Sequence, residues 1–319
     1  MNRIQADLIL LVAAAIWGFA FVFQKSAMAE VGPLTFIAAR CALAALALAP
    51  FAWREMQREP QVAAQTAAQT AAQTAAQTAG QTAALAADRQ FHGVVLIGGL
   101  AFFLAAAFQQ FGLVTATVTN SSFITALYVI FTPCIVWAWH YRPPAPVVWP
   151  AAAVSFLGTW LLGGGLLGTV SFGDVLIAVC AVFWALHVVI TGVAAQHGRP
   201  LCFTFLQFVI VGMLGLIGAL LTENPSLTGL LGAAPQIAYV GLLSSALTFT
   251  WLIQAMRHTP AGEAAIIVST ESLFGALAGA VLLGERLTPI AWIGAALIAM
   301  ATIAVQLAPH RATKPPARS

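Results

Sequence analysis

The sequence predicts an all-α membrane protein with ten transmembrane helices, arranged as two inverted five-helix repeats. Three observations predict it: an apolar composition, a series of long apolar blocks, and a similarity between the two halves of the chain. Of the 319 residues, 61% are hydrophobic and 7% are charged, whereas soluble domains carry about 25% charged residues. The 13 basic and 10 acidic side chains are too few to solvate a globular surface. We therefore expect the chain to lie mainly in lipid.

The same composition excludes several classes of protein. The formal net charge is +3 and the basic residues form no run, which argues against a nucleic-acid partner. The four cysteines lie in apolar segments, without a CxxC pair or a His/Cys ligand spacing, so we interpret them as small buried apolar residues. The sequence predicts no metal site and no cofactor.

Ten apolar blocks are separated by Pro, Gly or charged residues, and most are close to the length of about 20 residues that a membrane-spanning helix needs. Their continuous apolar character disfavours a β-barrel, whose strands alternate between apolar and polar residues. Short connections make most successive helices antiparallel neighbours. The predicted spans cover residues 8–29, 33–53, 92–114, 118–140, 146–162, 174–195, 201–222, 234–256, 262–284 and 289–307.

The first block also has features of a signal peptide, because Arg3 precedes the apolar stretch and residues 27–29 read Ala-Met-Ala, like a cleavage site. An internal repeat argues against that alternative. Trp17 and Pro33 have counterparts in Trp184 and Pro200 at a constant offset of 167 residues. The first block therefore belongs to the repeated unit and is expected to remain in the protein.

Further along the chain the offset between the halves becomes 143, which aligns Tyr128 with Glu271. The change in offset requires an insertion in the first half, and residues 63–82 are five near-perfect Ala-Ala-Gln-Thr tetrads. We interpret the segment at about 61–87 as a linker, disordered or marginally helical, because it has little to bury. The predicted units are a first repeat at 1–162, a second at 172–307 and a cytoplasmic tail at 308–319.

Five spans per repeat is an odd number, so the second repeat enters the membrane upside down relative to the first, as in many secondary transporters. The basic residues give an independent indication of orientation. With the N-terminus in the cytoplasm, the outer loops carry only Arg286, and the positive-inside rule then places both termini in the cytoplasm. The inner segments carry Arg3, Arg54, Arg58, Arg89, Arg142, Arg199, Arg257, Arg311, Lys314 and Arg318.

Four stretches of the sequence form a recognisable pattern. They are Trp17-Gly18-Phe19 running to Lys25, the Pro33 to Arg40 start of the second span, residues 110–133, and residues 263–288 with Gly284-Glu285-Arg286-Leu287. Together they resemble the drug/metabolite transporter superfamily, and specifically its EamA-type ten-helix members. The resemblance implies a central cavity, alternating access, and export, or less often uptake, of small metabolites such as amino acids through the cell inner (plasma) membrane. It does not imply an enzyme.

Two departures from the family pattern stand out. The ninth span reads Thr270-Glu271-Ser272 where many relatives have a Glu-Pro pair, which puts a proline kink there in doubt. The first half reads Arg142-Pro143-Pro144 where the second has Glu285-Arg286-Leu287, so the Gly-Glu turn occurs only once.

Ionisable residues inside the spans are the first candidates for a substrate-binding site, because they are costly in a bilayer and usually face the bundle interior. Arg40 lies about 10 Å into the second span at 1.5 Å per residue. It is either an anchor for a carboxylate or phosphate or a structural partner of carbonyls or an acid. Glu271, in the middle of the ninth span, suits proton coupling or binding of a substrate amine, or it is a neutral carboxyl bonded to a neighbouring helix. Its counterpart Tyr128 offers a hydroxyl to the same space.

Two aromatic helix faces complete the predicted substrate site. Trp17 and Gln24 share one face of the first span with Phe21, and Trp184 and His187 share one face of the sixth. Because the two tryptophans are repeat counterparts, we expect the faces to line opposite walls of one cavity, although such aromatics also pack helix bundles. His187 either titrates or makes a fixed hydrogen bond.

Other residues and functions remain as alternatives. Lys25 either extends to the lipid headgroups or serves the substrate. An intramembrane enzyme lacks HExxH, GxSxG and paired aspartates, and no P-loop is present for ATP hydrolysis. A non-transporting scaffold needs none of the buried polar residues. The expected partners are a small-molecule substrate and the lipid bilayer, with proton coupling and a homodimer left open.

Overall fold

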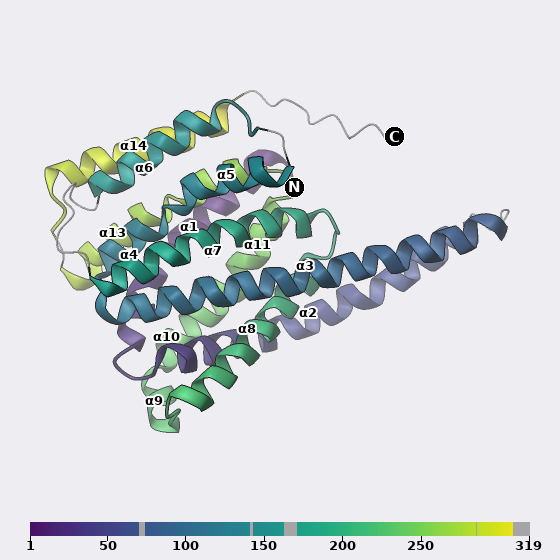
Figure 1. The fold of residues 1–319 in the computed structure, drawn as a ribbon, viewed down its shortest axis with the longest axis horizontal. Helices are drawn as coiled ribbons and strands as arrows, with labels where there is room; N and C mark the ends of the chain where they lie inside the picture. Colours follow the sequence, from purple (N-terminus) through teal and green to yellow (C-terminus); the bar gives the residue numbers. More distant parts are fainter. Residues whose placement is uncertain (70–73, 141–142, 163–170, 285, 309–319) are drawn as a thin grey trace.

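The computed structural model describes residues 1–69, 74–140, 143–162, 171–284 and 286–308, and these form a bundle of helices without strands (Figure 1). The basic residue Arg142, the acidic residue Glu285 and the tail from residue 309 lie outside this part. The elements are α1 (Arg3–Ala27), α2 (Pro33–Gln69), α3 (Thr74–Thr115), α4 (Val118–Thr125), α5 (Tyr128–His140), α6 (Val148–Leu162), α7 (Phe172–Ala195), α8 (Pro200–Thr222), α9 (Leu227–Gly232), α10 (Ala234–Ala238), the π-helix η1 (Tyr239–Leu247), α11 (Thr248–Ala255), α12 (Ala261–Val268), α13 (Glu271–Leu283) and α14 (Pro289–Leu307).

In the described ranges, nine helical segments are long and apolar enough to cross a membrane, against ten predicted spans. The exception is the fifth predicted span, which corresponds to α6 and has only 15 residues. A helix of that length reaches about 22 Å at 1.5 Å per residue, less than the hydrocarbon core of about 30 Å. The helix α6 lies alongside α14 (Figure 1), so it remains part of the bundle.

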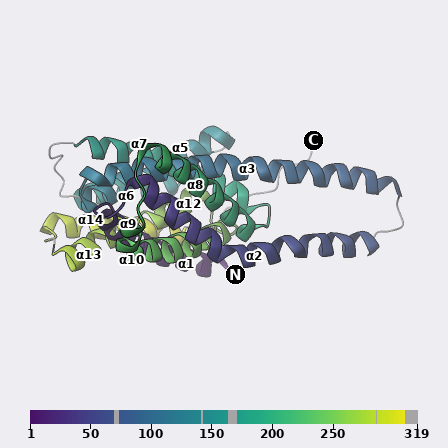
Figure 2. The ribbon, with the colours of Figure 1, turned by 90° about the horizontal axis from the view of Figure 1, so that it is seen from below.

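The described residues of the Gln/Thr-rich insertion are helical. The helices α2 and α3 continue through it to Gln69 and from Thr74, and together they project beyond the bundle as a helical hairpin (Figures 1 and 2). Of the two predicted alternatives, the helical one therefore holds for the described residues. Alanine and glutamine are good helix formers, and both arms continue helices that are anchored in the bundle.

Two of the spans are broken in the middle. One is divided into α4 and α5 at residues 126–127, and the other into α12 and α13 at residues 269–270. At each break the backbone changes to i→i+3 hydrogen bonds, such as Leu127 N–H to Ile124 O at 3.1 Å and Thr270 N–H to Ile267 O at 3.2 Å. The predicted counterparts Tyr128 and Glu271 are the first residues of the second segments, so each stands at a break.

The second break needs no proline, although the sequence departs from the family there. Side-chain hydroxyls bind the carbonyl groups near the break: Ser269 Oγ donates to Ile266 O at 2.7 Å, and Thr270 Oγ1 donates to Ile267 O at 2.7 Å. Non-helical backbone at membrane depth is tolerated where such partners replace the lost bonds.

Hydrogen bonds join α2 and α8 near both ends of this helix pair. Glu223, which follows α8, accepts hydrogen bonds from the backbone N–H groups of Leu34 and Thr35 at the start of α2, both at 2.8 Å. Near the opposite end, Glu55 of α2 accepts one from Cys202 N–H in the first turn of α8 at 2.6 Å. A carboxylate at a helix N-terminus satisfies free N–H groups and interacts favourably with the helix dipole. These contacts fix α2, which carries Arg40, against α8.

Close packing of α1 against α13 depends on Gly18. A Cβ atom at this position would lie 2.5 Å from Phe274 Cβ and 2.6 Å from Glu271 O. We expect Gly18→Ala to cost about 1–3 kcal/mol through overpacking, and to lower the apparent melting temperature in detergent. Gly93→Ala is the matched control, because nothing lies within 4 Å of a Cβ there. Equal melting temperatures of the two variants would show that the α1–α13 contact is not close-packed.

Candidate substrate-binding cavity

A central cavity of about 70 Å³ lies where the broken helices and the π-helical span meet. By volume it accepts a few water molecules or a small solute, because a water molecule needs roughly 10–15 Å³ on this measure. Its walls combine aromatic rings with buried polar groups. The lining residues are Trp17, Phe21, Gln24, Arg40, Gln109, Thr125, Tyr128, Trp184, His187, Val188, Ser244, Phe249, Leu252, Val268 and Glu271.

All seven residues that the sequence predicts for a substrate site line this one cavity. They come from α1, α2, α5, α7 and α13, so segments far apart in the chain converge here. The two predicted helix faces, with Trp17 on α1 and Trp184 on α7, both contribute to its wall. The seven residues are Trp17, Gln24, Arg40, Tyr128, Trp184, His187 and Glu271.

Among the residues that the structure describes, Arg40 is the only arginine or lysine that lines the central cavity, and it is 4% exposed. Its Nη1 donates to Ser245 Oγ at 3.1 Å, and its guanidinium carbon lies 5.7 Å from the centroid of the Phe102 ring. Its Nε atom is buried without a hydrogen-bond partner. Arg40 forms no ion pair with any acidic residue in the described part of the chain. A buried guanidinium in this condition is incompletely compensated and favours an anionic ligand.

Glu271 places a carboxyl group in the same cavity. It is 6% exposed, and its Oε1 atom is buried without a hydrogen-bond partner. The hydroxyl of Tyr128 is its near neighbour, and that oxygen also lacks a hydrogen bond of good geometry. No ion pair to Glu271 occurs among the residues that the structure places. The cavity thus contains one cationic and one acidic side chain that do not neutralise each other directly.

Aromatic rings cover one side of the cavity. Phe249 is the centre of the cluster: its ring centroid lies 5.0 Å from that of Trp17, 4.8 Å from Phe102 and 6.0 Å from Trp184. Phe102 in turn lies 5.1 Å from Trp184. Such rings provide apolar surface, and their faces also attract cations.

The sequence does not reveal the π-helix η1, and with it the roles of Ser244 and Ser245. The carbonyl oxygen of Ser244 accepts from Trp17 Nε1 at 2.8 Å and from Thr248 Oγ1 at 2.7 Å. Side chains that insert into the backbone ladder in this way distort a helix. The π-helix carries Ser244, which lines the cavity, and Ser245, which binds Arg40. The sequence signal for this stretch is the pair of adjacent serines, together with Thr248 and Thr250 in the same span.

The ammonium group of Lys25 has protein partners that the sequence did not predict. Its Nζ atom donates to three carbonyl oxygens at the end of α3, those of Leu113, Val114 and Ala116, at 2.6, 3.1 and 3.0 Å. It is not among the residues lining the cavity. The last carbonyls of a helix lack partners within the helix, and a cation satisfies them well. The sequence could not show that α3 ends beside α1.

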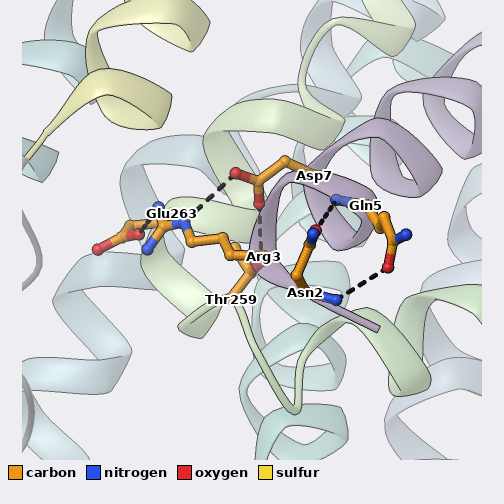
Figure 3. Close-up of polar contacts among 6 residues, drawn as sticks. All are labelled: Asn2, Arg3, Gln5, Asp7, Thr259 and Glu263. Carbon is orange, nitrogen blue, oxygen red and sulfur yellow. Dashed lines mark hydrogen bonds and ion pairs between the residues drawn. The ribbon is translucent and has the colours of Figure 1, made fainter.

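At the other end of α1, a polar network ties this helix to α12 (Figure 3). Arg3 forms ion pairs with Asp7 of α1 at 3.3 Å and with Glu263 in the first turn of α12 at 2.5 Å. Thr259 donates its hydroxyl hydrogen to Asp7 Oδ1 at 2.7 Å. Asp7 and Glu263 are 5% and 8% exposed, so the network is largely shielded from solvent.

Comparisons with known proteins agree with this architecture. The EamA-like transporter family matches residues 4–164 and 171–307. An uncharacterized transporter of Archaeoglobus fulgidus is 26% identical over 311 residues, which covers 96% of this chain and 87% of that protein. A solved crystal structure shares the fold with a TM-score of 0.71 at 18% identity, covering 96% of this chain and 98% of its own. The chain is therefore an integral membrane protein and a transporter, and it belongs to the EamA-like transporter family.

Proposed function

We propose that this protein is a secondary transporter that moves a small amino acid, or a related compound with both a carboxylate and an amine, by alternating access. The observation that carries the proposal is the pair Arg40 and Glu271, both buried in one cavity without an ion pair between them. A zwitterionic solute would neutralise both at once. Neither an intramembrane enzyme nor a scaffold requires this arrangement.

The other unpartnered atoms around the cavity fit the same kind of solute. The indole Nε1 of Trp184 is a buried donor without a partner, like Arg40 Nε. His187 Nδ1 and Glu271 Oε1 are buried without partners, and a ligand would satisfy such groups. The two donors suit a carboxylate. The cavity volume of about 70 Å³ favours small solutes.

Alternating access is supported by a difference between the two ends of the bundle. At one end, Asp7 Oδ1 accepts a hydrogen bond from Thr259, across to the segment before α12. Its counterpart in the second half, Asp174, hydrogen-bonds within its own helix start, to Ser171, and its Oδ1 is buried without a partner among the described residues. We infer that the first end is closed in this state, since no equivalent contact joins the second end in the part of the chain that the structure describes.

The remaining parts of the proposal follow from the repeat and the family. We propose ten membrane crossings in two inverted repeats, at 1–162 and 172–307, with α6 as the fifth crossing of the first repeat. We place the protein in the cell inner (plasma) membrane, with both termini in the cytoplasm. The matching positions of the two breaks support the duplication. Export is the direction that the family resemblance favours.

A thermal-shift screen of the purified protein tests the substrate class. We expect glycine and alanine to raise the apparent melting temperature, because a ligand that binds the folded state stabilises it. Acetate and methylamine are matched half-ligands, each with one of the two charged groups. They should bind about 10- to 100-fold more weakly, since a hydrogen bond to a charged group is worth about 1.5–3 kcal/mol. Tighter binding of a half-ligand, a nucleoside or an organic acid would contradict the proposal.

A further inference from the structure

Gln207 forms a hydrogen bond with His187 on the side of the imidazole ring away from the central cavity. His187 lies on α7 with no exposed surface, and Gln207 of α8 is 1% exposed. The two side chains are hydrogen-bonded between His187 Nε2 and Gln207 Oε1 at 2.9 Å. His187 lines the central cavity and Gln207 does not. The edge of the imidazole ring that carries Nε2 therefore points away from the cavity.

The partners of Nε2 indicate where the ring carries its hydrogen. The amide oxygen of Gln207 can only accept a hydrogen bond. Thr191 Oγ1 lies 3.5 Å from Nε2, but its own hydrogen is donated to the backbone carbonyl of His187 at 2.8 Å. Both oxygens thus present lone pairs to Nε2, which must be the N–H nitrogen. In the neutral ring Nδ1 is then an acceptor.

This acceptor has no partner in the described part of the protein. Nδ1 of His187 is buried and makes no hydrogen bond. The ring is packed among aromatic residues, with centroids 5.1 Å from Phe102, 5.7 Å from Phe249 and 5.8 Å from Trp184. None of these rings offers a donor to Nδ1 in this state. A buried acceptor left unpaired is costly, so a ligand that brings a donor gains affinity.

We propose that Gln207 is a positioning residue, which holds His187 as the Nε2–H tautomer so that Nδ1 accepts a hydrogen bond from an N–H group of the transported solute. The inference rests on the proposed function and sharpens it. The solute must carry an amine with hydrogens. A quaternary ammonium has the same charge, and aromatic rings attract it too, but it has no N–H for His187.

The tautomer is tested first, without any solute. In protein labelled with ¹⁵N-histidine, the resonances of His187 are those absent from the His187→Asn variant. We expect the wild type to show the Nε2–H tautomer. Gln207→Met, which has similar length and no strong acceptor, should give a mixture of tautomers, and Gln207→Glu should restore the Nε2–H form. An Nδ1–H ring in the wild type, or an unchanged ring in Gln207→Met, would overturn the role of Gln207.

The solute contact is tested with glycine and N,N,N-trimethylglycine, which share the carboxylate and the positive charge. We expect the wild type to bind glycine at least about 10-fold more tightly, one hydrogen bond to a charged group being worth about that factor. The ratio should fall several-fold in Gln207→Met and persist in Gln207→Glu. Glycine should also shift the Nδ1 resonance of His187.

Equal affinities of the two compounds, or an Nδ1 resonance that does not move on glycine binding, would overturn the proposed contact. The proposed function and the positioning role of Gln207 can be disproved separately. If neither compound nor any other amino acid binds the wild type, the proposed function is wrong and the solute contact falls with it. The tautomer measurement then still decides whether Gln207 positions His187.

Discussion

Replacing Arg40 with glutamine is expected to weaken the binding of glycine or alanine by about 100-fold, because a charge-assisted, bidentate hydrogen bond to the carboxylate of the solute is lost. Glutamine is a natural choice of substitute, since Gln207 is the repeat counterpart of Arg40. Arg40→Lys keeps the charge but not the planar guanidinium group, so its affinity for the solute should lie between those of the wild type and Arg40→Gln. Isothermal titration of purified protein measures all three.

The same variants decide between the two interpretations of Arg40 that the sequence left open. A structural arginine would be saturated with protein partners, whereas Arg40 has one hydrogen bond to Ser245, a contact with the Phe102 ring and an unpaired Nε. We therefore expect Arg40→Gln to keep or raise the melting temperature while binding is lost, because binding sites are commonly held at the expense of stability.

Arg257→Gln is the matched control for the loss of an arginine. Arg257 is exposed and does not line the cavity, so the control should bind like the wild type. Two results would contradict the anchor role: unchanged affinity in Arg40→Gln, or unfolding of that variant with wild-type binding recovered when it is stabilised. The first would assign Arg40 to the architecture alone.

The sequence predicted which residues would line one cavity better than it predicted the backbone around that cavity. The candidate residues were found because an ionisable or amphipathic side chain in a span has few reasons to be there, and the same physical cost makes it face the interior. Arg40, Glu271 and Tyr128 could be selected on that ground alone. The helical periods of α1 and α7 then added Trp17 and Trp184, on two faces that both line the cavity.

What the sequence could not give is information about partners. Phe102 and Phe249 look like any other apolar residue of a span until the fold places both rings beside Trp184. Ser245 becomes meaningful only because η1 turns it toward Arg40. For Lys25 the sequence offers headgroups or substrate as partners, because nothing in it places the end of α3 beside this side chain. These are tertiary facts, and no local pattern encodes them.

Glu271→Gln is expected to abolish proton-coupled transport. A buried carboxylate without a cationic partner is neutralised either by a proton or by the amine of a solute, and the two compete for the same oxygen atoms. Because the carboxylate carries either a proton or the solute, this competition couples the movement of protons in one direction to the movement of solute in the other. Glutamine keeps the size and shape of the glutamate side chain, but it does not take up a proton and has no negative charge to pair with an ammonium group. The substitution leaves unchanged the hydroxyl groups of Ser269 and Thr270, which bind the carbonyl groups at the α12–α13 break.

The measurement is transport of glycine or alanine into proteoliposomes with and without an imposed pH gradient. In the wild type the gradient should raise the initial rate several-fold. In Glu271→Gln the ratio of the two rates should fall to about one, and because a ratio cancels differences in protein activity, a merely weakened variant would not give this result. Glu30→Gln is the control, since Glu30 is an exposed acid outside the cavity. A gradient effect in Glu271→Gln equal to that of the wild type would exclude Glu271 as the coupling residue. If the wild type shows no gradient effect, exchange of solute for solute would be the remaining source of energy.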